Sequence, residues 1–443
     1  MSAVSPSIYE YVVIESADGS RSIDISAACA TIQYFEDIYS PTITAKLLIV
    51  NTGQSIKGKE DEQLQSLYNG LPIRGGERVC LKISGNTESN PGLAFLKEDV
   101  GDYLYVSSIT NVIRTSTRET FVLNLVSREA LTNETSRVGK KFIGLPVEKH
   151  VENIVKDYLH TEKQLIADKT ENQYSFIGNL KKPFSLLTWL ASKSVPASDD
   201  TPGTDATAGY CFFETRSGFN FKSIDSMISS KPVNEEPYFY TEVVEMRDGT
   251  EDRRIIKYST SENQDLVGKL RKGTYCSYRM FFDPLHLTFI QKNFTSDDYL
   301  GKARTTGERP VLPKIEGSDK DIGDLPSRIV TAVVDRGTFD PEVSKKENDL
   351  SPMKTQSQAM MRYNVINTQT LSMMVPSNTN LQAGNVINCE FPYTTVKEAG
   401  TGTDPLQSGL YMIRGLCHHF STDGSYTSLE LIKDTFGEQE KLS

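Results

Sequence analysis

Two segments, one near each end of the chain, repeat the same pattern of apolar residues. The first runs from GGERVCLKI through YLYVSSITNVIRTSTRETFVLNLVSR, and the second runs from AGNVINCEF through YMIRGLCHHFSTDGSYTSLELIKD. An offset of about 308 residues, with a one-residue gap before the last strand, aligns Gly76 with Gly384, Val106 with Ile413, Ile109 with Leu416 and Ile113 with Phe420. The same alignment pairs Leu81 with Cys389, Leu123 with Leu429 and Leu125 with Leu431. The repeat core that we predict consists of Val79, Leu81, Ile83, Ile387, Phe391, Leu429 and Leu431. The match indicates a duplication, and the alternative is that any two amphipathic strand pairs can be slid into register.

Both copies of the repeat alternate apolar and polar residues, as half-buried strands do. The same alternation marks YEYVVIES, ATIQYFEDI and TITAKLLIV in the first 130 residues. Asp18-Gly19, between the first of these and IDIS, is a strong hairpin signal. The sequence therefore predicts a mainly β fold with an α+β insert, in which two small antiparallel β-barrel domains are interrupted by other material.

The length of 443 residues favours about three domains. We predict a first β-barrel domain over 1–130, an α+β domain over 131–232 and the first part of a second barrel over 233–300. An extended arm with a short helix follows over 301–364, and the second part of the second barrel occupies 365–443. The arm is assigned from its Gly, Pro and charge content, with RIVTAVV as a strand and SPMKTQSQAMMRYNVI as the helix.

The α+β segment is predicted to contain two helices and a hairpin. The first helix covers LPVEKHVENIVKDYLH with Pro146 at its first position, and the second follows Pro183 and carries the single tryptophan, Trp189. A hairpin with its turn at Gly218 is predicted over GYCFFETRSGFNFKSID, after a mobile polar loop, ASDDTPGTDATAG. Strand alternation places Tyr210, Phe212 and Glu214 on one face of the hairpin's first strand, and Cys211, Phe213 and Thr215 on the other.

No pattern in the sequence points to a catalytic, cofactor-binding or metal site. The chain has no Walker A, GxGxxG, GxSxG or HExxH motif. His418 and His419 are neighbours on a predicted strand, so one points inward and one outward, and they cannot share the convergent ligands of a zinc site. Acidic pairs such as Glu235-Glu236 arise freely among 58 acidic residues and are expected to be solvated. We therefore expect no enzyme activity, no cofactor and no metal.

Charge and apolar runs exclude further classes of protein. A net charge of -10 argues against a basic surface that grips nucleic acid. The most apolar stretches are only strand-length and the start does not have the pattern of a signal peptide, so we expect neither a membrane nor secretion. The six cysteines are scattered without a CxxC pair and are expected to be buried, reduced thiols.

Several of these segments together resemble the baseplate hub of contractile-tailed bacteriophages, and also the hub part of type VI secretion spikes and tailocins. The resemblance runs from ALTNETSRVGKKF through NQYSFIGNLKKPFSLLTWLASKSVP to GYCFFETRSGFNFKSIDSMI, and returns in GNVINCEFP, SGLYMIRGLCHHFS and YTSLELIKDTFG. It covers about half of the chain. Its signature residues are structural: Trp189, Gly209, Tyr210, Phe212, Phe213, Glu214, Gly218, Phe219 and Phe221.

The resemblance implies a specific architecture and set of partners. Hubs of this family carry two tube-type β-barrel domains per chain, and three chains form a ring with pseudo-sixfold symmetry. Such a homotrimer adapts the hexameric tail tube, or its initiator protein, to the trimeric central spike, and it also contacts baseplate wedge proteins. DNA or tape-measure protein passes through the channel of the ring. An acidic chain would repel the DNA backbone and would therefore not bind DNA tightly. The implied location is the tail baseplate of a virion assembled in the host cytoplasm.

The chain departs from some relatives, because no segment remains for a fused lysozyme or needle domain. A hydrolase or spike that takes part would be a separate polypeptide. Two other functions stay open at the level of sequence. One is the hub of a non-viral contractile injection system, and the other is a carbohydrate-active tail protein, which only the β-rich, tyrosine-rich composition supports.

Overall fold

The computed structural model describes residues 4–52, 56–57, 64–71, 73–87, 90–96, 103–197, 207–241, 251–262, 264–284, 287–297, 303–307, 311–334, 352–393 and 403–437. Within these residues the chain is mainly β, as predicted, with one sheet of fourteen strands and four smaller sheets. The large sheet contains two sets of strands that we call the first and second sheet units.

The first sheet unit comes from the N-terminal part of the chain. Its strands follow the spatial order β3-β4-β10-β9-β7-β1, with β2 beyond β1 and β8 beside β7. Their bounds are β1 Ile8–Glu15, β2 Ser22–Asp24, β3 Cys29–Asp37, β4 Thr44–Thr52, β7 Arg78–Ser84, β8 Leu93–Phe95, β9 Leu104–Arg114 and β10 Arg118–Ser127. Short elements fill the connections: η1 Ser26–Ala28, β5 Ile56–Lys57, β6 Leu64–Gln65 and α1 Leu67–Gly70. The predicted Asp18-Gly19 hairpin joins β1 to β2, with Gly19 at a φ of 70°.

The second sheet unit repeats this order with strands from the C-terminal part of the chain. Its order is β17-β21-β24-β23-β22-β16, strand for strand the same as β3-β4-β10-β9-β7-β1. The bounds are β16 Tyr238–Phe239, β17 Lys257–Glu262, β21 Gln369–Pro376, β22 Val386–Glu390, β23 Gly409–Ser421 and β24 Ser425–Lys433, with η4 Glu251–Arg253 between β16 and β17. One pairing differs, because β16 runs parallel to β22 whereas β1 runs antiparallel to β7.

The duplication extends to single hydrogen bonds and to a bulge. The Gly76 amide donates to the Val106 carbonyl at 2.7 Å, and the Gly384 amide donates to the Ile413 carbonyl at 2.8 Å. Both glycines have positive φ, 90° and 83°. The ladder skips Ser107 between β9 and β10, and it skips Arg414 at the matching point between β23 and β24. Chance alignment of two strand pairs does not produce the same strand order, bulge and hydrogen bonds, so the predicted duplication is confirmed.

One predicted equivalence is wrong. Sequence alignment matched Ile113 with Phe420, but β9 carries a second irregularity between Thr110 and Ile113, where Asn111 adopts a φ of 54°. Ile113 therefore lies opposite Thr120, which is the position that His419 takes opposite Tyr426 in the second unit. A one-residue bulge reverses which face each later side chain occupies. Ile113 is consequently exposed, whereas Phe420 is fully buried.

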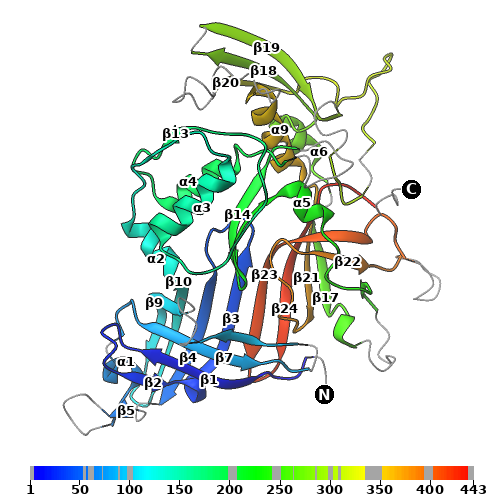
Figure 1. The fold of residues 1–443 in the computed structure, drawn as a ribbon. Helices are drawn as coiled ribbons and strands as arrows, with labels where there is room; N and C mark the ends of the chain where they lie inside the picture. The colour runs from blue at the N-terminus through cyan, green and yellow to red at the C-terminus, as the bar shows by residue number, and fades with distance from the viewer. Residues whose placement is uncertain are drawn as a thin grey trace.

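Each unit encloses its own apolar core. In Figure 1, β1, β2 and β7 lie across β3, β4, β9 and β10, and the first core is built from both layers. The second core draws on β16, β21, β22, β23 and β24. The repeat-core residues and their aligned partners Leu123, Leu125 and Cys389 are all buried in these two cores: Val79, Leu81, Ile83, Leu123, Leu125, Ile387, Cys389, Phe391, Leu429 and Leu431.

The two units are joined into one sheet by a pairing between β23 and β3. Gly415–Ser421 of β23 pair antiparallel with Thr31–Asp37 of β3. Phe420, a residue of the second unit, is buried in the first unit's core. Eight successive antiparallel strands result, in the order β17-β21-β24-β23-β3-β4-β10-β9.

The α+β insert lies between the two units in sequence and has a separate core. Its elements are α2 Arg128–Thr135, β11 Lys141–Phe142, α3 Val147–Ile154, η2 Val155–Leu159, β12 Leu165–Ala167, β13 Phe176–Ile177, α4 Pro183–Ala191, β14 Tyr210–Thr215, β15 Gly218–Ser223 and α5 Ile224–Ser229. Both predicted helices form. Pro183 is the first residue of its helix, whereas Pro146 lies one residue before α3. The predicted mobile loop falls largely on 198–206, outside the described residues.

The segment 266–334 corrects the predicted layout. We expected the strands up to residue 300 to join the second barrel, but β18 Cys276–Asp283 and β19 Thr288–Thr295 pair with each other and with β20 Arg328–Val333 in a separate three-stranded sheet. This distal sheet, with α6 Leu266–Lys272, lies at the opposite end of the molecule from the first unit (Figure 1). Phe281 and Phe294 pack with Met361 of helix α9 Pro352–Val365. Alternation predicts a strand but not the sheet it joins, so β18 and β19 lie outside the second unit and pair with β20, the strand predicted within the arm.

Candidate functional site

The signature hairpin β14–β15 is wedged between two apolar cores. Tyr210 and Phe212 face the insert's core, together with Phe219 and Phe221 of β15. Cys211 and Phe213 face a different core, to which β22, β23 and β24 of the second unit contribute. Every residue of β14 is buried. The predicted split of the two faces is therefore observed, and it explains why a short hairpin is apolar on both sides.

The other signature residues are two glycines with positive φ and Trp189, which packs against the insert's core. Gly218 has a φ of 117°, and a Cβ there would lie 2.3 Å from the Gln164 carbonyl oxygen. Gly209 has a φ of 131°. Trp189 of α4 is half-buried, and it packs edge-on against Phe176 with a centroid separation of 5.6 Å. Only glycine accommodates both the φ and the close backbone approach at Gly218.

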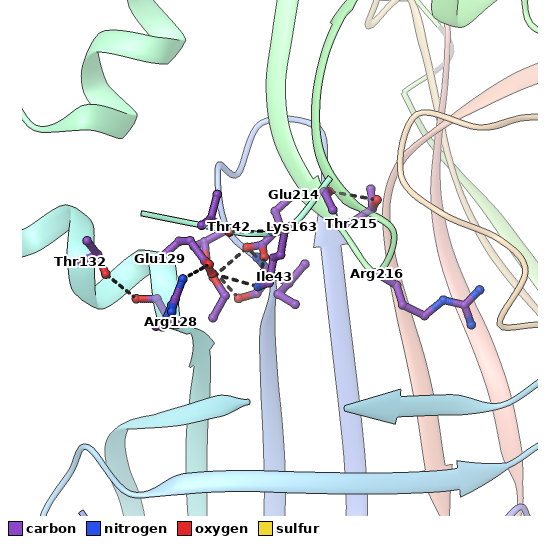
Figure 2. Close-up of polar contacts among 12 residues, drawn as sticks. Thr42, Ile43, Arg128, Glu129, Thr132, Lys163, Glu214, Thr215 and Arg216 are labelled. Carbon is purple, nitrogen blue, oxygen red and sulfur yellow. Dashed lines mark hydrogen bonds and ion pairs between the residues drawn. The ribbon is translucent and has the colours of Figure 1, made fainter. Parts of the chain in front are cut away.

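The hairpin ends against the first sheet unit through Glu214, as Figure 2 shows. One carboxylate oxygen accepts hydrogen bonds from the Ser127 hydroxyl at 2.7 Å and from the Ile43 amide at 3.1 Å. The other oxygen accepts from Lys163 Nζ at 2.7 Å. Lys163 Nζ also donates to Glu129 at 2.9 Å, so one ammonium group is shared by two carboxylates.

The electrostatics of this cluster are those of a buried structural joint. Glu129 and Glu214 have no exposed side-chain area and Lys163 has 11%. Burial raises the pKa of Glu214, although Lys163 opposes that shift. Burial also works against the charge on Lys163, but the two carboxylates outweigh it and leave the Lys163 pKa above its ordinary value. Removing one member of such a group leaves an uncompensated buried charge, which is strongly destabilising.

Glu36 of β3 forms a second polar joint that reaches three parts of the chain. Its carboxylate accepts hydrogen bonds from the Tyr34 hydroxyl at 2.8 Å, from the Arg216 amide at 2.7 Å and from the Ala383 amide at 2.9 Å. These donors belong to the first unit, the hairpin turn and the loop before β22. Burial raises the pKa of Glu36 from 4.5 to about 7, and the three hydrogen bonds limit the shift.

The hairpin also contacts the second unit at the repeat glycine. A Cβ on Gly384 would lie 3.0 Å from the ring tip of Phe213 and 3.2 Å from the Met227 sulfur. A Cβ on Gly76, the equivalent glycine of the first unit, would meet nothing within 4 Å. The two repeats therefore differ at this glycine, because the hairpin side chain Phe213 packs against Gly384 and not against Gly76.

Arg362 of α9 completes the junction from the other side. Its guanidinium lies 2.9 Å from Asp225 at the start of α5 and 3.1 Å from Asp434 after β24, and all three side chains are buried. No sequence pattern predicts this group, because the three residues are far apart in the chain and no local spacing links them. The same holds for Glu36, which sequence reasoning also missed.

The arrangement is suited to fixing parts of the fold against each other. Glu36, Glu214 and Arg362 each bridge separate parts of the fold through hydrogen bonds or ion pairs. His418 is buried between Thr427 and the Leu381 carbonyl, whereas His419 is half-buried and stacks on Tyr426, which matches the predicted inward and outward orientations.

Across the described ranges, no group of three or more His, Cys, Asp or Glu residues could hold a metal ion. Five of the six cysteines are buried and all six are free thiols.

No helix in the described part of the chain has both the length and the apolar content needed to cross a membrane.

No protein-family model matches this chain, and no curated protein matches its sequence. Solved structures do match it over nearly the whole length. A tail protein from Neisseria meningitidis MC58 is similar with a TM-score of 0.52 and 12% identity, covering 96% of each chain. The 43 kDa tail protein of prophage MuSo2 from Shewanella oneidensis is similar with a TM-score of 0.51 and 8% identity, covering 96% of this chain and 98% of the other. The chain therefore shares its fold with these two tail proteins, which confirms the predicted resemblance at the level of the fold.

Proposed function

We propose that this chain is a structural hub of a contractile tail, of which three copies form a ring with six near-equivalent sheet units. The observation that carries the proposal is the duplicated sheet order, with its matching bulge and matching glycine hydrogen bonds. A trimer can meet a hexameric tube only if each subunit offers two near-equivalent surfaces. A chain that folds the same unit twice meets that requirement.

The sheet face that turns away from the two cores supports a role as a channel wall. One row across it reads Tyr426, His419, Gln33, Lys46, Asn124 and Ser108, on six successive strands. Two pairs in this row are within hydrogen-bonding distance: Gln33 lies 3.2 Å from His419, and the Asn124 amide donates to Ser108 at 3.1 Å. A polar face of this breadth suits a water-filled passage for DNA or tape-measure protein.

The proposal assigns a role to each part of the chain. The two sheet units are the tube-type barrel domains, the first within 1–130 and the second divided between the segments around 233–262 and 365–443. The α+β insert within 131–232 fixes the two units against each other. The distal sheet, which replaces part of the predicted arm, is the surface we assign to wedge proteins. One end of the ring faces the tail tube and the other faces the central spike. The ring is part of a virion tail baseplate, and the chain has no enzymatic activity.

The test is the mass of the purified full-length chain by light scattering, alone and after addition of a trimeric spike protein. A particle of three chains, about 148 kDa from a 49.4 kDa subunit, is expected in at least one condition. A chain that stays monomeric in both contradicts the proposal. Zymography on cell-wall material checks the second part, since clear lysis by the purified chain would overturn the non-enzymatic assignment.

A further inference from the structure

Leu180 has a backbone conformation that leucine ordinarily avoids. It lies between β13 and α4 with a φ of 55°, next to Asn179 with a φ of 50°. The Lys181 amide donates to the Gly178 carbonyl at 3.0 Å, so these four residues form a turn with positive φ at both central positions. Asparagine followed by glycine is the usual sequence of such a turn, because the Cβ of a larger residue is crowded at positive φ.

The strain at Leu180 is not offset by burial of its side chain, which is 68% exposed. The turn itself is firmly held. The Leu180 amide donates to the Val138 carbonyl at 2.9 Å, and the Val138 amide donates to the Lys181 carbonyl at 2.9 Å. A Cβ on Gly139 would lie 3.1 Å from Leu180 Cδ2, so the leucine lies over a glycine. An exposed apolar side chain in a strained but well-bonded turn indicates a contact with another molecule.

The surface around Leu180 is both apolar and basic. Segments 138–145 and 177–182, which pair through β11 and β13, form what we call the Leu180 patch. Three more of its apolar side chains are between 37% and 41% exposed: Ile143, Leu145 and Ile177. The two segments contain four lysines and no acidic residue, although the whole chain has a net charge of -10. Figure 1 shows β13 at the end of the insert that lies away from the first sheet unit.

The lysines of the patch lie at the surface with weak partners. Lys181 Nζ is 5.3 Å from the centroid of the Trp189 ring. Lys140 lies 3.8 Å from Asp157, and Lys182 pairs with Glu134, and all four of these charged side chains are exposed. Exposed ion pairs contribute little to stability. These ammonium groups are therefore available to the carboxylates of a binding partner.

We propose that the Leu180 patch binds another polypeptide, which presents an apolar pocket surrounded by carboxylates. Leu180 enters the pocket and the lysines pair with the carboxylates around it. Interfaces concentrate their binding free energy in a few central anchors within a polar rim, and complementary charge selects the partner. One projecting leucine suits a pocket rather than a bilayer, because membrane binding grows with the apolar area that enters the lipid. The inference goes beyond the proposed function, which gives the insert an internal role, and does not depend on the ring.

Zero-length crosslinking tests the chemistry of the partner. A water-soluble carbodiimide joins a lysine amine to a carboxylate that it contacts. It is added to an extract of cells that produce the full-length chain together with the proteins encoded next to it, and linked peptides are identified by mass spectrometry. We expect Lys141 or Lys181 to be linked to Asp or Glu of a different polypeptide. The internal link from Lys182 to Glu134 shows that the reagent has worked.

Two glycine variants of the same turn separate the side chain from the backbone strain. Leu180→Gly removes both the anchor and the strain, whereas the matched control Asn179→Gly keeps the anchor. We expect Leu180→Gly to lower the yield of the link to the other polypeptide about tenfold, and Asn179→Gly to leave it unchanged. The purified variants should unfold at the same urea concentration as the native chain or a higher one. A lower midpoint for Leu180→Gly shows that Leu180 stabilises the fold, which overturns the inference.

The other possible occupants of the patch give different results. A link from the patch to a second copy of this chain overturns the choice of a different polypeptide. Sedimentation of the purified chain with vesicles of phosphatidylglycerol and phosphatidylcholine, abolished by Leu180→Gly, assigns the patch to an anionic membrane and overturns a protein partner. An internal link from Lys182 to Glu134 without any link to another polypeptide overturns the proposal altogether. A chain that is monomeric by light scattering contradicts the proposed hub but leaves this inference standing.

Discussion

Replacing Gly384 by alanine tests whether the hairpin is packed against the second unit as tightly as the structure indicates. Gly384 and Gly76 are equivalent residues with positive φ, and their amides make equivalent hydrogen bonds. An added Cβ at positive φ costs about 1–2 kcal/mol at either position. At Gly384 the Cβ also presses on Phe213 and Met227, both buried, and overpacking of this kind adds about 1–3 kcal/mol. We therefore expect Gly384→Ala to lower the free energy of unfolding more than Gly76→Ala does.

The assay is equilibrium unfolding in urea followed by circular dichroism, with the comparison restricted to variants whose slope against urea is unchanged. A second variant, Gly384→Ala/Phe213→Leu, removes the ring tip that the new Cβ approaches at 3.0 Å and is expected to recover part of the difference. Equal losses for Gly384→Ala and Gly76→Ala would falsify the reasoning, because Phe213 of the hairpin packs against Gly384 and no atom lies within 4 Å of a Cβ at Gly76.

Three further predictions concern buried ionisable groups. Lys163→Met leaves the carboxylates of Glu129 and Glu214 buried without a cation, so we expect a loss of about 3–5 kcal/mol in urea unfolding. Burial raises the pKa of Glu36 from 4.5 to about 7, so between these pH values the folded chain keeps a proton that the unfolded chain releases. The free energy of unfolding of the native chain, measured relative to that of Glu36→Gln, should therefore fall by on the order of 3 kcal/mol as the pH rises from 4.5 through 7. Burial lowers the pKa of His418 from 6.5 to about 3, so this group contributes stability above pH 6.5 that is lost as pH falls towards 3, and its ring resonances should not titrate between pH 5 and 8.

Each of these predictions has a control. Lys149→Met removes an exposed ion pair with Glu152 and should cost only about 0–1 kcal/mol, so a similar loss for Lys163→Met contradicts the account of the buried cluster. Both the native chain and Glu36→Gln contain His418, so the difference between their free energies of unfolding cancels the opposite pH dependence of that residue. If this difference grows in favour of the native chain as the pH rises, the prediction for Glu36 is wrong. A His418 resonance that shifts with a midpoint near 6.5 shows that the ring is solvated.

The parts of the fold that the sequence predicted are those set by local periodicity. Alternation located the strands, and Asp18-Gly19, Gly218 and Pro183 marked turns and a helix start. The duplication was visible in the sequence because inward positions, such as Leu81 and Leu429, are apolar in both copies, whereas the outward positions differ between the copies. The split of the hairpin's faces at Cys211 and Phe212 followed from the same two-residue period.

The parts that could not be predicted depend on contacts between distant segments. Alternation in ATIQYFEDI places Glu36 on the same face as Ile32 and Tyr34, but it does not identify the hydrogen-bond donors, because only the folded chain brings Arg216 and Ala383 to the Glu36 carboxylate. Strands β18 and β19 alternate as well as any others, but alternation does not specify a partner sheet. The bulge at Asn111 shifted one equivalence by a residue, because asparagine tolerates a positive φ without any sequence pattern that requires it.

The bulge at Asn111 also bears on why the two repeats are not identical. The β23–β3 contact forms within one chain, so its strands are held together by the fold on either side, and Phe420 can be buried in the neighbouring core. A contact between separate chains must form after folding, and an edge strand that buried a large ring only on assembly would expose it beforehand. By inserting one residue, the bulge turns Ile113 to the outward face and leaves Arg114 at the position of Phe420, where it lies over the Tyr68 ring with its guanidinium 4.2 Å from the ring centroid. The first unit thereby presents a charged side chain, packed on the Tyr68 ring, at the point where the second unit presents phenylalanine, and a charge on an edge strand discourages indiscriminate strand pairing.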